Sequence, residues 1–292
     1  APARGASVLF DAPGPRTRRR VLVASVVAAL VLAGLLVLAL LRLAERGQLD
    51  AELWAPLLDP RTEEFAIVWG RVGEGLSLTL RGAAAATVLS VVVGILVASV
   101  RLSLGRVARL PLVGAVELLR GLPVVVTIIY VRALAPALGL DVPDFWILVI
   151  GLTLYNAVII SEIVRAGVLS LPRGQVEAGL AVGLTRAQTM RLVQLPQAVR
   201  AMLPALISQL VVILKDTALA SIVLTNLRDT LWHADRIRDS LDNPLQMYTV
   251  IALVFIVLCL ALDRLARWTE RRISRSTTTA AAPVTAVGGQ EG

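Results

Sequence analysis

The chain has 292 residues and a formal net charge of +8, and 57% of its residues are hydrophobic while only 17% are charged. A soluble domain averages roughly 45–50% apolar and about 25% charged residues, so this composition favours a surface that faces lipid. The single cysteine, Cys259, excludes a disulfide framework and a cysteine-based metal cluster. The arginines lie beside apolar runs, which fits orientation in a membrane better than nucleic-acid binding.

Six apolar segments are each long enough to cross a hydrocarbon core of about 30 Å. Because a backbone in lipid must satisfy its own hydrogen bonds, we expect each segment to be a helix in an all-α membrane protein. The first exceeds the length of a signal-peptide core and lacks a cleavage site, so we expect it to be retained. The segments cover residues 21–41, 76–100, 110–138, 145–164, 201–224 and 247–265.

Charges between the segments predict their orientation. Arginines gather in the N-terminal tail (1–20), after the second and fourth segments, and in the C-terminal tail (269–292), which is predicted to be disordered. The loop at 42–74 is rich in acidic residues. By the positive-inside rule, both termini should be cytoplasmic and the loop at 42–74 extracytoplasmic, in a multi-pass protein of the cell membrane. The only histidine, His233, falls in the last outer loop, where we expect a solvent-exposed side chain.

A polar loop at 171–199 is too long for a simple turn and too polar to enter the bilayer. Its sequence predicts a short helix over 175–182 that is broken by Gly183. A second helix should start at Thr185, with a glutamine three residues later completing a capping box, and should end at Pro196. Two short helices that meet at a glycine would form a compact, basic knob on the cytoplasmic side.

Five short motifs follow one another within residues 75–223. They are Arg-Gly-Leu-Pro at 120–123, Ser-Glu-Ile-Val-Arg-Ala-Gly at 161–167, Gly-Gln-Val-Glu-Ala at 174–178, Leu-Pro-Gln-Ala at 195–198 and Lys-Asp-Thr-Ala-Leu at 215–219. In this order they resemble the permeases of ABC importers for polar amino acids, in particular the glutamate permeases of actinobacteria. One such motif is weak support for a family, whereas five in the family's order are specific.

The resemblance implies an ABC type I importer-like bundle of six spans, with a permease domain at 75–268 and an additional first helix at 21–41. In this family the loop at 171–199, the EAA loop, holds a coupling helix that docks on a cytoplasmic ATPase. Gly179 stands where the motif has its second alanine, a small-for-small change that should not disturb docking. The residues carried over for ATPase coupling are Glu177, Ala178, Gly179, Gly183, Leu184, Thr185 and Arg186.

Charged, polar or helix-breaking residues within the apolar segments are candidates for the substrate path or a gate, because such groups face a cavity or a partner in membrane helices. Helix breaks near the midplane also open backbone groups to substrates in transporters. The candidates are Arg120, Gly121, Pro123, Asn156, Glu162, Arg165, Lys215 and Asp216.

Each candidate also has a structural interpretation. Glu162 and Arg165 are three residues apart and share a helix face, so they can form an ion pair. Asn156 can hydrogen-bond to a neighbouring helix, and the Gly-Leu-Pro break can simply kink one. Lys215 lies inside the fifth apolar segment and needs a partner, for which Glu162 and Glu117 are the predicted choices.

The chain has no Walker-type phosphate loop and only one histidine, so neither ATP hydrolysis nor a serine-hydrolase triad is predicted. The resemblance implies no cofactor on this chain, with ATP and Mg bound by a separate ATPase dimer. It further implies a second permease subunit, an extracytoplasmic solute-binding protein, membrane lipid and an amino-acid substrate as partners, and no nucleic acid. An ion-gradient-driven secondary transporter and a non-transporting membrane scaffold stay open as alternatives, which ATP dependence and substrate flux would distinguish.

Overall fold

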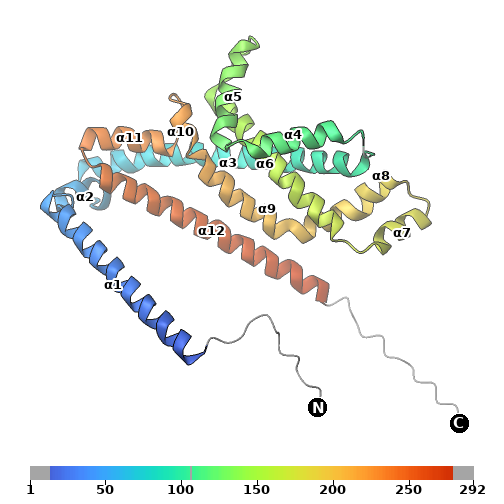
Figure 1. Cartoon of the computed structure of the whole chain (residues 1–292). Coiled ribbons are helices and arrows are strands. Elements are labelled where there is room, and N and C mark those ends of the chain that lie inside the picture. Colours follow the sequence, from blue (N-terminus) through green and yellow to red (C-terminus); the bar gives the residue numbers. More distant parts are fainter. Residues whose placement is uncertain (1–13, 106, 279–292) are drawn as a thin grey trace.

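The computed structural model describes residues 14–105 and 107–278, and every regular element in this part of the chain is a helix. Figure 1 shows the order of the helices in space. They are α1 (Pro15–Glu45), α2 (Ala51–Leu58), α3 (Glu63–Ser103), α4 (Leu110–Gly121), α5 (Val124–Ala137), α6 (Asp144–Leu169), α7 (Gly174–Ala181), α8 (Arg186–Thr189), a π-helical turn η1 (Met190–Gln194), α9 (Leu195–Thr217), α10 (Ala220–Val223), α11 (Thr230–Leu241) and α12 (Pro244–Thr278).

Five of the described helices are long and apolar enough to cross a membrane, and the bent pair α4–α5 makes a sixth if it is counted as one broken span. The predicted all-α membrane bundle is therefore confirmed. The predicted break in the third segment near residues 120–123 is confirmed, since α4 and α5 meet there at an angle of 109°. Pro123 has no N–H to continue the hydrogen-bond ladder of α4, so the chain can turn sharply at this position.

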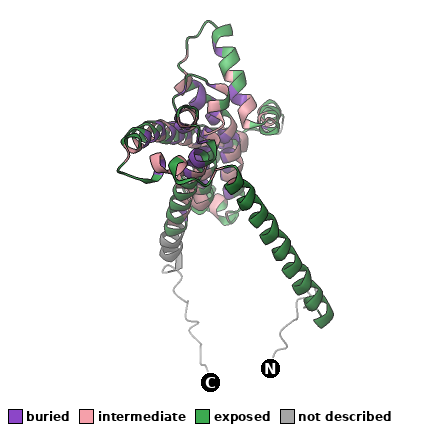
Figure 2. Ribbon diagram, turned by 90° about the vertical axis from the view of Figure 1, so that its left-hand side faces the viewer, coloured by how far each residue is buried: buried purple, intermediate pink, exposed green. Residues whose placement is uncertain are grey.

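α1 extends away from the rest of the bundle (Figures 1 and 2). Within the described structure none of its residues is buried, although its most apolar window has a mean hydropathy of 3.0. A helix that is apolar on all sides must be covered by lipid or by protein. Because no other described element covers α1, its composition fits a span surrounded by lipid, as the sequence predicts for the additional first helix.

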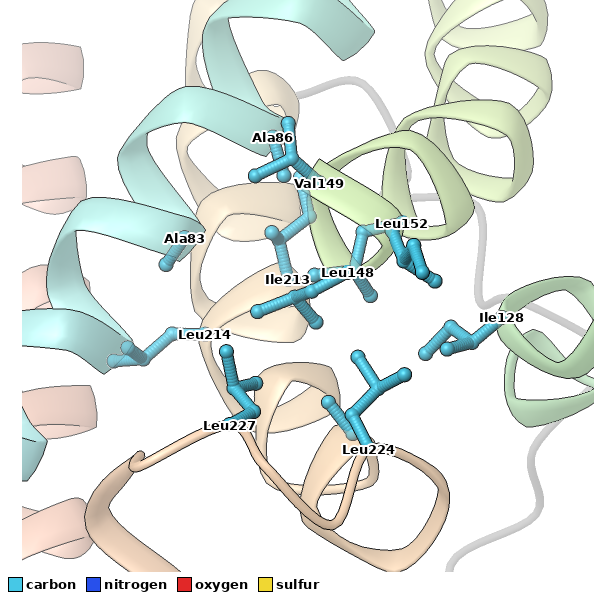
Figure 3. Packing of buried hydrophobic residues seen from close by; sticks show 12 residues of the cluster. Ala83, Ala86, Ile128, Leu148, Val149, Leu152, Ile213, Leu214, Leu224 and Leu227 are labelled. Atoms are coloured by element: carbon cyan, nitrogen blue, oxygen red, sulfur yellow. The ribbon is translucent and has the colours of Figure 1, made fainter. Parts of the chain in front are cut away.

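The centre of the bundle is α6, and glycines let its neighbours approach closely. A Cβ atom added at Gly94 of α3 would lie 2.9 Å from the Ala157 carbonyl oxygen of α6, and one at Gly151 of α6 would lie 2.9 Å from Cα of Ile128 in α5. Small residues at helix contacts let backbones pack tightly in membranes. Figure 3 shows side chains of α3, α5, α6 and α9 converging in the resulting core.

α11 packs against α3 and the start of α12 around a second core that includes Val72, Ile237 and Met247. This packing buries His233, which is only 6% exposed, so the predicted solvent-exposed histidine is wrong. Burial lowers the pKa of His233 below its usual value. The error arose because α11 reads as a polar loop in the sequence, whereas one face of this helix is apolar and covered.

The ends of the fold extend beyond the predicted segments. α1 begins at Pro15, inside the predicted tail 1–20, and α12 continues to Thr278, inside the predicted disordered tail 269–292. The remaining parts of both tails lie outside the described residues. The fifth apolar segment also differs from the prediction, because α9 ends at Thr217 and a separate turn of helix, α10, follows.

Asp229 caps α11 in a buried position, and we expect it to make stability depend on pH. The carboxyl is 2% exposed and accepts a hydrogen bond from the backbone N–H of Trp232 at 2.8 Å. Burial raises the pKa of Asp229 to about 6, so the folded chain holds a proton that the unfolded chain releases near pH 4. Stability should therefore fall as pH rises from 4 to 6 and stay level above, because the folded state binds more protons in that window.

Asp229→Asn should remove this loss, since asparagine is an equally good N-cap and carries no charge. In detergent, we expect the variant to unfold at a higher temperature than the parent at pH 7.5 and at a similar temperature at pH 4. Asp229→Ala, which loses the cap, should be less stable than Asp229→Asn at both pH values. A parent–variant difference that does not change between pH 4 and pH 7.5 would contradict the buried-carboxylate explanation.

Candidate coupling site and substrate path

The loop between α6 and α9 folds into a knob of two short helices that meet at Gly183. The backbone N–H of Leu184 donates to the Gly179 carbonyl at 3.1 Å, and that of Gly183 donates to the Leu180 carbonyl at 3.0 Å. Gly183 has φ +86°, so the end of α7 has the bonds and the left-handed residue of a Schellman motif. The predicted break at Gly183 is confirmed.

The next helix starts two residues later. The backbone N–H of Gln188 donates to Thr185 Oγ1 at 3.3 Å, and the N–H of Thr185 donates to Gln188 Oε1 at 2.8 Å. These two bonds form the predicted capping box at the start of α8. The Schellman motif that ends α7 is followed directly by the capping box that starts α8. Local hydrogen bonds therefore fix the angle between these two helices.

Pro196 does not end the second helix, which corrects the sequence prediction. α8 continues through the π-helical turn η1 into α9, and the backbone N–H of Leu195 donates to the Met190 carbonyl. The wider turn changes the hydrogen-bond register just before the proline, which then occupies the first turn of α9, where its missing N–H is tolerated. The knob is therefore continuous with the membrane helix α9.

Side chains anchor the knob to the bundle. Gln197 of α9 donates to Gln175 Oε1 of α7 at 3.0 Å. Val168, Met190 and Ala198 form a small buried cluster that joins the end of α6, the π turn and the start of α9. A displacement of the knob must therefore move α6 and α9 as well.

The outer surface of the knob combines apolar and charged groups. Val182 is 77% exposed and Leu192 is 66% exposed. Beside them a cavity of about 620 Å³ is lined by residues 102–105 and by parts of α7, α8 and η1. Exposed apolar side chains within a polar surface mark protein–protein contacts. Of the residues predicted for ATPase coupling, Glu177, Ala178, Gly183, Thr185 and Arg186 are exposed and Leu184 is half-buried.

Gly179 is the exception, because it is buried inside the knob. A Cβ atom at this position would lie 2.6 Å from Thr189 Cγ2 and 2.8 Å from Thr189 Oγ1, and Thr189 itself is fully buried. By sequence alone, glycine in place of the motif's alanine is a small-for-small change. In this chain the Cβ of an alanine would collide with the buried, β-branched side chain of Thr189.

We therefore expect Gly179→Ala to destabilise the knob by about 1–3 kcal/mol through overpacking. Limited proteolysis of the purified protein should cut the loop at 171–199 faster in this variant. Ala178→Gly, an exposed neighbour in the same helix, is the matched control for a change of helix propensity without a clash. Thr189→Ser in the Gly179→Ala background should restore resistance, because serine lacks the methyl group that is approached most closely.

Glu162 lies near the C-terminal end of α6 and connects two helices. Its Oε2 accepts from Arg165 Nε at 2.8 Å, which confirms the predicted pair on one helix face, and its Oε1 accepts from Arg101 Nη1 at the end of α3. The side chains of Arg101 and Glu162 are 14% and 20% exposed. The bridge from α3 to α6 was missed by the sequence reasoning.

Lys215 and Asp216 occupy the last turn of α9 rather than the middle of a span, because α9 ends at Thr217. Lys215 forms no ion pair with any described residue, so the predicted pairing with Glu162 or Glu117 is wrong. Its side chain is exposed at the end of α9. A role of either residue in the substrate path stays a prediction.

The helix break between α4 and α5 is exposed, whereas the side-chain amide of Asn156 in α6 is buried. Arg120, Gly121 and Pro123 are exposed at the bend between α4 and α5. Asn156 is fully buried, and Gln209 Nε2 of α9 donates to its Oδ1 at 2.7 Å. The interhelical interpretation of Asn156 is thereby confirmed, while a substrate contact by any of these residues stays a prediction. Gln209 was missed because it lies in another helix.

Comparison with known proteins agrees with this architecture. A family model described as "Binding-protein-dependent transport system inner membrane component" matches residues 90–275. The glutamate transport system permease protein GluD of Corynebacterium glutamicum is 37% identical over 237 residues, covering 79% of this chain and 83% of that protein. The arginine transport system permease protein ArtQ of Bacillus subtilis is 28% identical over 205 residues, covering 68% of this chain and 91% of that protein.

Among solved structures, the crystal structure of an amino acid ABC transporter with histidines matches with a TM-score of 0.64 and 29% identity. The match covers 71% of this chain and 96% of that chain. The helical bundle, the anchored knob and these matches define the chain as a membrane-embedded transport component. It belongs to the family of binding-protein-dependent transport system inner membrane components, which confirms the resemblance found in the sequence.

Proposed function

We propose that this chain is the permease subunit of an ATP-driven importer for a polar amino acid, glutamate or a related compound. The anchored knob, whose outer surface displays apolar and basic side chains, carries the proposal, because such a mixed surface on a rigid projection of a membrane bundle supports a docking partner. The GluD and ArtQ relatives transport amino acids of opposite charge by name, so they support the amino-acid class more strongly than glutamate itself.

In this proposal an ATPase dimer binds ATP and Mg, docks on the knob and moves it, while this chain hydrolyses nothing itself. A second permease subunit, identical or different, completes the translocation path, and an extracytoplasmic solute-binding protein delivers the amino acid. The arginine-rich ends support a cytoplasmic location for both termini by the positive-inside rule. Because the knob is continuous with α9 and packs against the end of α6, its displacement would tilt the two helices that share the Asn156–Gln209 hydrogen bond.

Uptake into vesicles that contain the permease, its ATPase and its partner subunits tests the proposal. With binding protein outside the vesicles and ATP within them, a labelled amino acid should accumulate. Gly183→Asp should abolish that accumulation, because an aspartate both strains φ +86° and adds a negative charge to the docking surface. Gly139→Asp is the matched control, since Gly139 has φ +72° and equal free space at the far end of α5.

We expect the Gly139→Asp variant to keep most of its uptake, so that a general effect of strain is separated from an effect at the knob. ATP hydrolysis measured in the same vesicles should become independent of the binding protein in the Gly183→Asp variant. Accumulation that ignored ATP and followed an imposed ion gradient would overturn the proposed function.

A further inference from the structure

A charged pocket lies at the N-terminal end of α6, away from the coupling knob. It has a volume of about 460 Å³ and opens where the α5–α6 loop, the α10–α11 loop and Leu78 of α3 meet. Its charged and amide side chains are Arg132, Asp141, Asp144, Asn226 and Arg228. With both termini in the cytoplasm and α6 crossing the membrane, this pocket faces the side from which substrate arrives.

One carboxylate of the pocket is only half satisfied. Arg132 Nη1 donates to Asp144 Oδ1 at 2.7 Å, but Asp144 Oδ2 is buried and has no hydrogen-bond partner among the described residues. An ionised carboxylate can accept about four hydrogen bonds, and a buried acceptor without a donor costs free energy. Asp144 therefore keeps one unsatisfied acceptor oxygen within the lining of the pocket.

Two further charges of the pocket are not paired with each other or with other charges. Within residues 14–105 and 107–269, Asp141 and Arg228 take part in no ion pair. The Arg228 guanidinium instead lies 5.7 Å from the centroid of the Trp232 ring, which leaves its N–H groups available for an anion. The guanidinium of Arg228, the carboxylate of Asp141 and the unpartnered Oδ2 of Asp144 thus belong to the lining of a single cavity.

We propose that this pocket receives the α-ammonium and α-carboxylate of the arriving amino acid, an inference that rests on the proposed function. The ammonium lies against Asp141 and Asp144, and the carboxylate lies against Arg228. Two arginines and two aspartates give the lining no net charge, so a zwitterion is balanced there, whereas an anion or a cation alone is not. The pocket recognises the head group common to all amino acids, and selection among side chains takes place elsewhere.

The experiment uses the reconstituted complex of permease, ATPase and partner subunits, without binding protein. Cys259 is replaced by alanine and Asn226 by cysteine, and the rate of alkylation by a membrane-impermeant maleimide is followed. Glutamate or glutamine at twice its Kd should slow alkylation about threefold, since the free fraction falls as 1/(1 + [L]/Kd). N-acetylglutamine, which lacks the ammonium, and glutamine α-amide, which lacks the carboxylate, should protect far less.

Asp141→Asn and Arg228→Gln, both at exposed positions, should each remove the protection, whereas Arg228→Lys should retain part of it. No protection by either amino acid, or equal protection by the N-acetyl compound, would overturn the proposal. In a second set of samples the binding protein is added without free amino acid; protection seen only there would also overturn the proposal and would make the pocket a docking contact. ATP-driven uptake by the unmodified complex is measured in parallel, so that failure of the pocket is distinguished from failure of the importer function.

Discussion

Replacing Gly151 by alanine is expected to prevent stable assembly of the bundle around α6. The added Cβ would lie 2.8 Å from Ile128 Cγ1 and 2.9 Å from Ile128 Cα, so relief requires α5 as a whole to move, not one side chain to rotate. Overpacking of this kind costs about 1–3 kcal/mol and at times more, and α5 is held to the bundle mainly by α6. Thermal unfolding of the purified variant in detergent, together with its yield in the membrane, measures the loss.

Two other glycines provide graded controls for Gly151→Ala. At Gly82 of α3 the nearest atom to a new Cβ is Leu148 Cδ2 at 3.1 Å, the tip of a flexible side chain, so Gly82→Ala should have a small effect. At Gly114 of α4 nothing lies within 4 Å, and Gly114→Ala should be neutral or slightly stabilising because alanine favours a helix. Adding Ile128→Ala to Gly151→Ala should restore stability only in part, since Cα of residue 128 stays in place. Equal effects at all three glycines would show that helix propensity, not close approach, controls stability.

Local rules were enough to predict the knob. The break at Gly183 and the cap at Thr185 depend on residues within one or two turns, and the structure has the expected bonds at both positions. The same holds for Glu162 and Arg165, which lie three residues apart on one helix face. The limit of this reasoning appears at Pro196, where a π turn absorbs the proline that sequence rules treat as a helix end.

Contacts between distant helices could not be predicted in the same way. Arg101 lies 61 residues from Glu162, and Gln209 lies 53 residues from Asn156, so no spacing rule connects them. The role of Gly179 was missed for the same reason, because its neighbour Thr189 lies across the turn between α7 and α8. A single sequence shows which residues can enter the membrane and where helices end, but the rotation of each helix about its axis decides which polar groups meet.

Replacing Glu162 by glutamine is expected to weaken both the bundle and substrate uptake. The change leaves the guanidinium groups of Arg101 and Arg165 beside a neutral amide, at the point where α3 and α6 approach the coupling loop. These side chains are partly exposed, so we expect a loss of about 1–3 kcal/mol, between the values for surface pairs and for fully buried pairs. Asp263→Asn, which breaks the exposed pair with Arg267 in α12, is the matched control and should have little effect.

A charge exchange distinguishes a clamp between α3 and α6 from a gate that must open. In the double variant Arg101→Glu with Glu162→Arg, a carboxylate on α3 again faces an arginine on α6, although the arginine introduced at position 162 and Arg165 then share one helix face. Stability and uptake should therefore recover in part relative to either single variant. Thermal unfolding and ATP-dependent uptake are measured for all four members of the cycle. If Glu162→Gln instead unfolds like the parent and lets amino acid pass without ATP, the bridge acts as a gate and the clamp interpretation is wrong. Loss of stability together with loss of uptake, both restored in part by the exchange, is the result expected of a clamp that transmits the movement of the knob to α3.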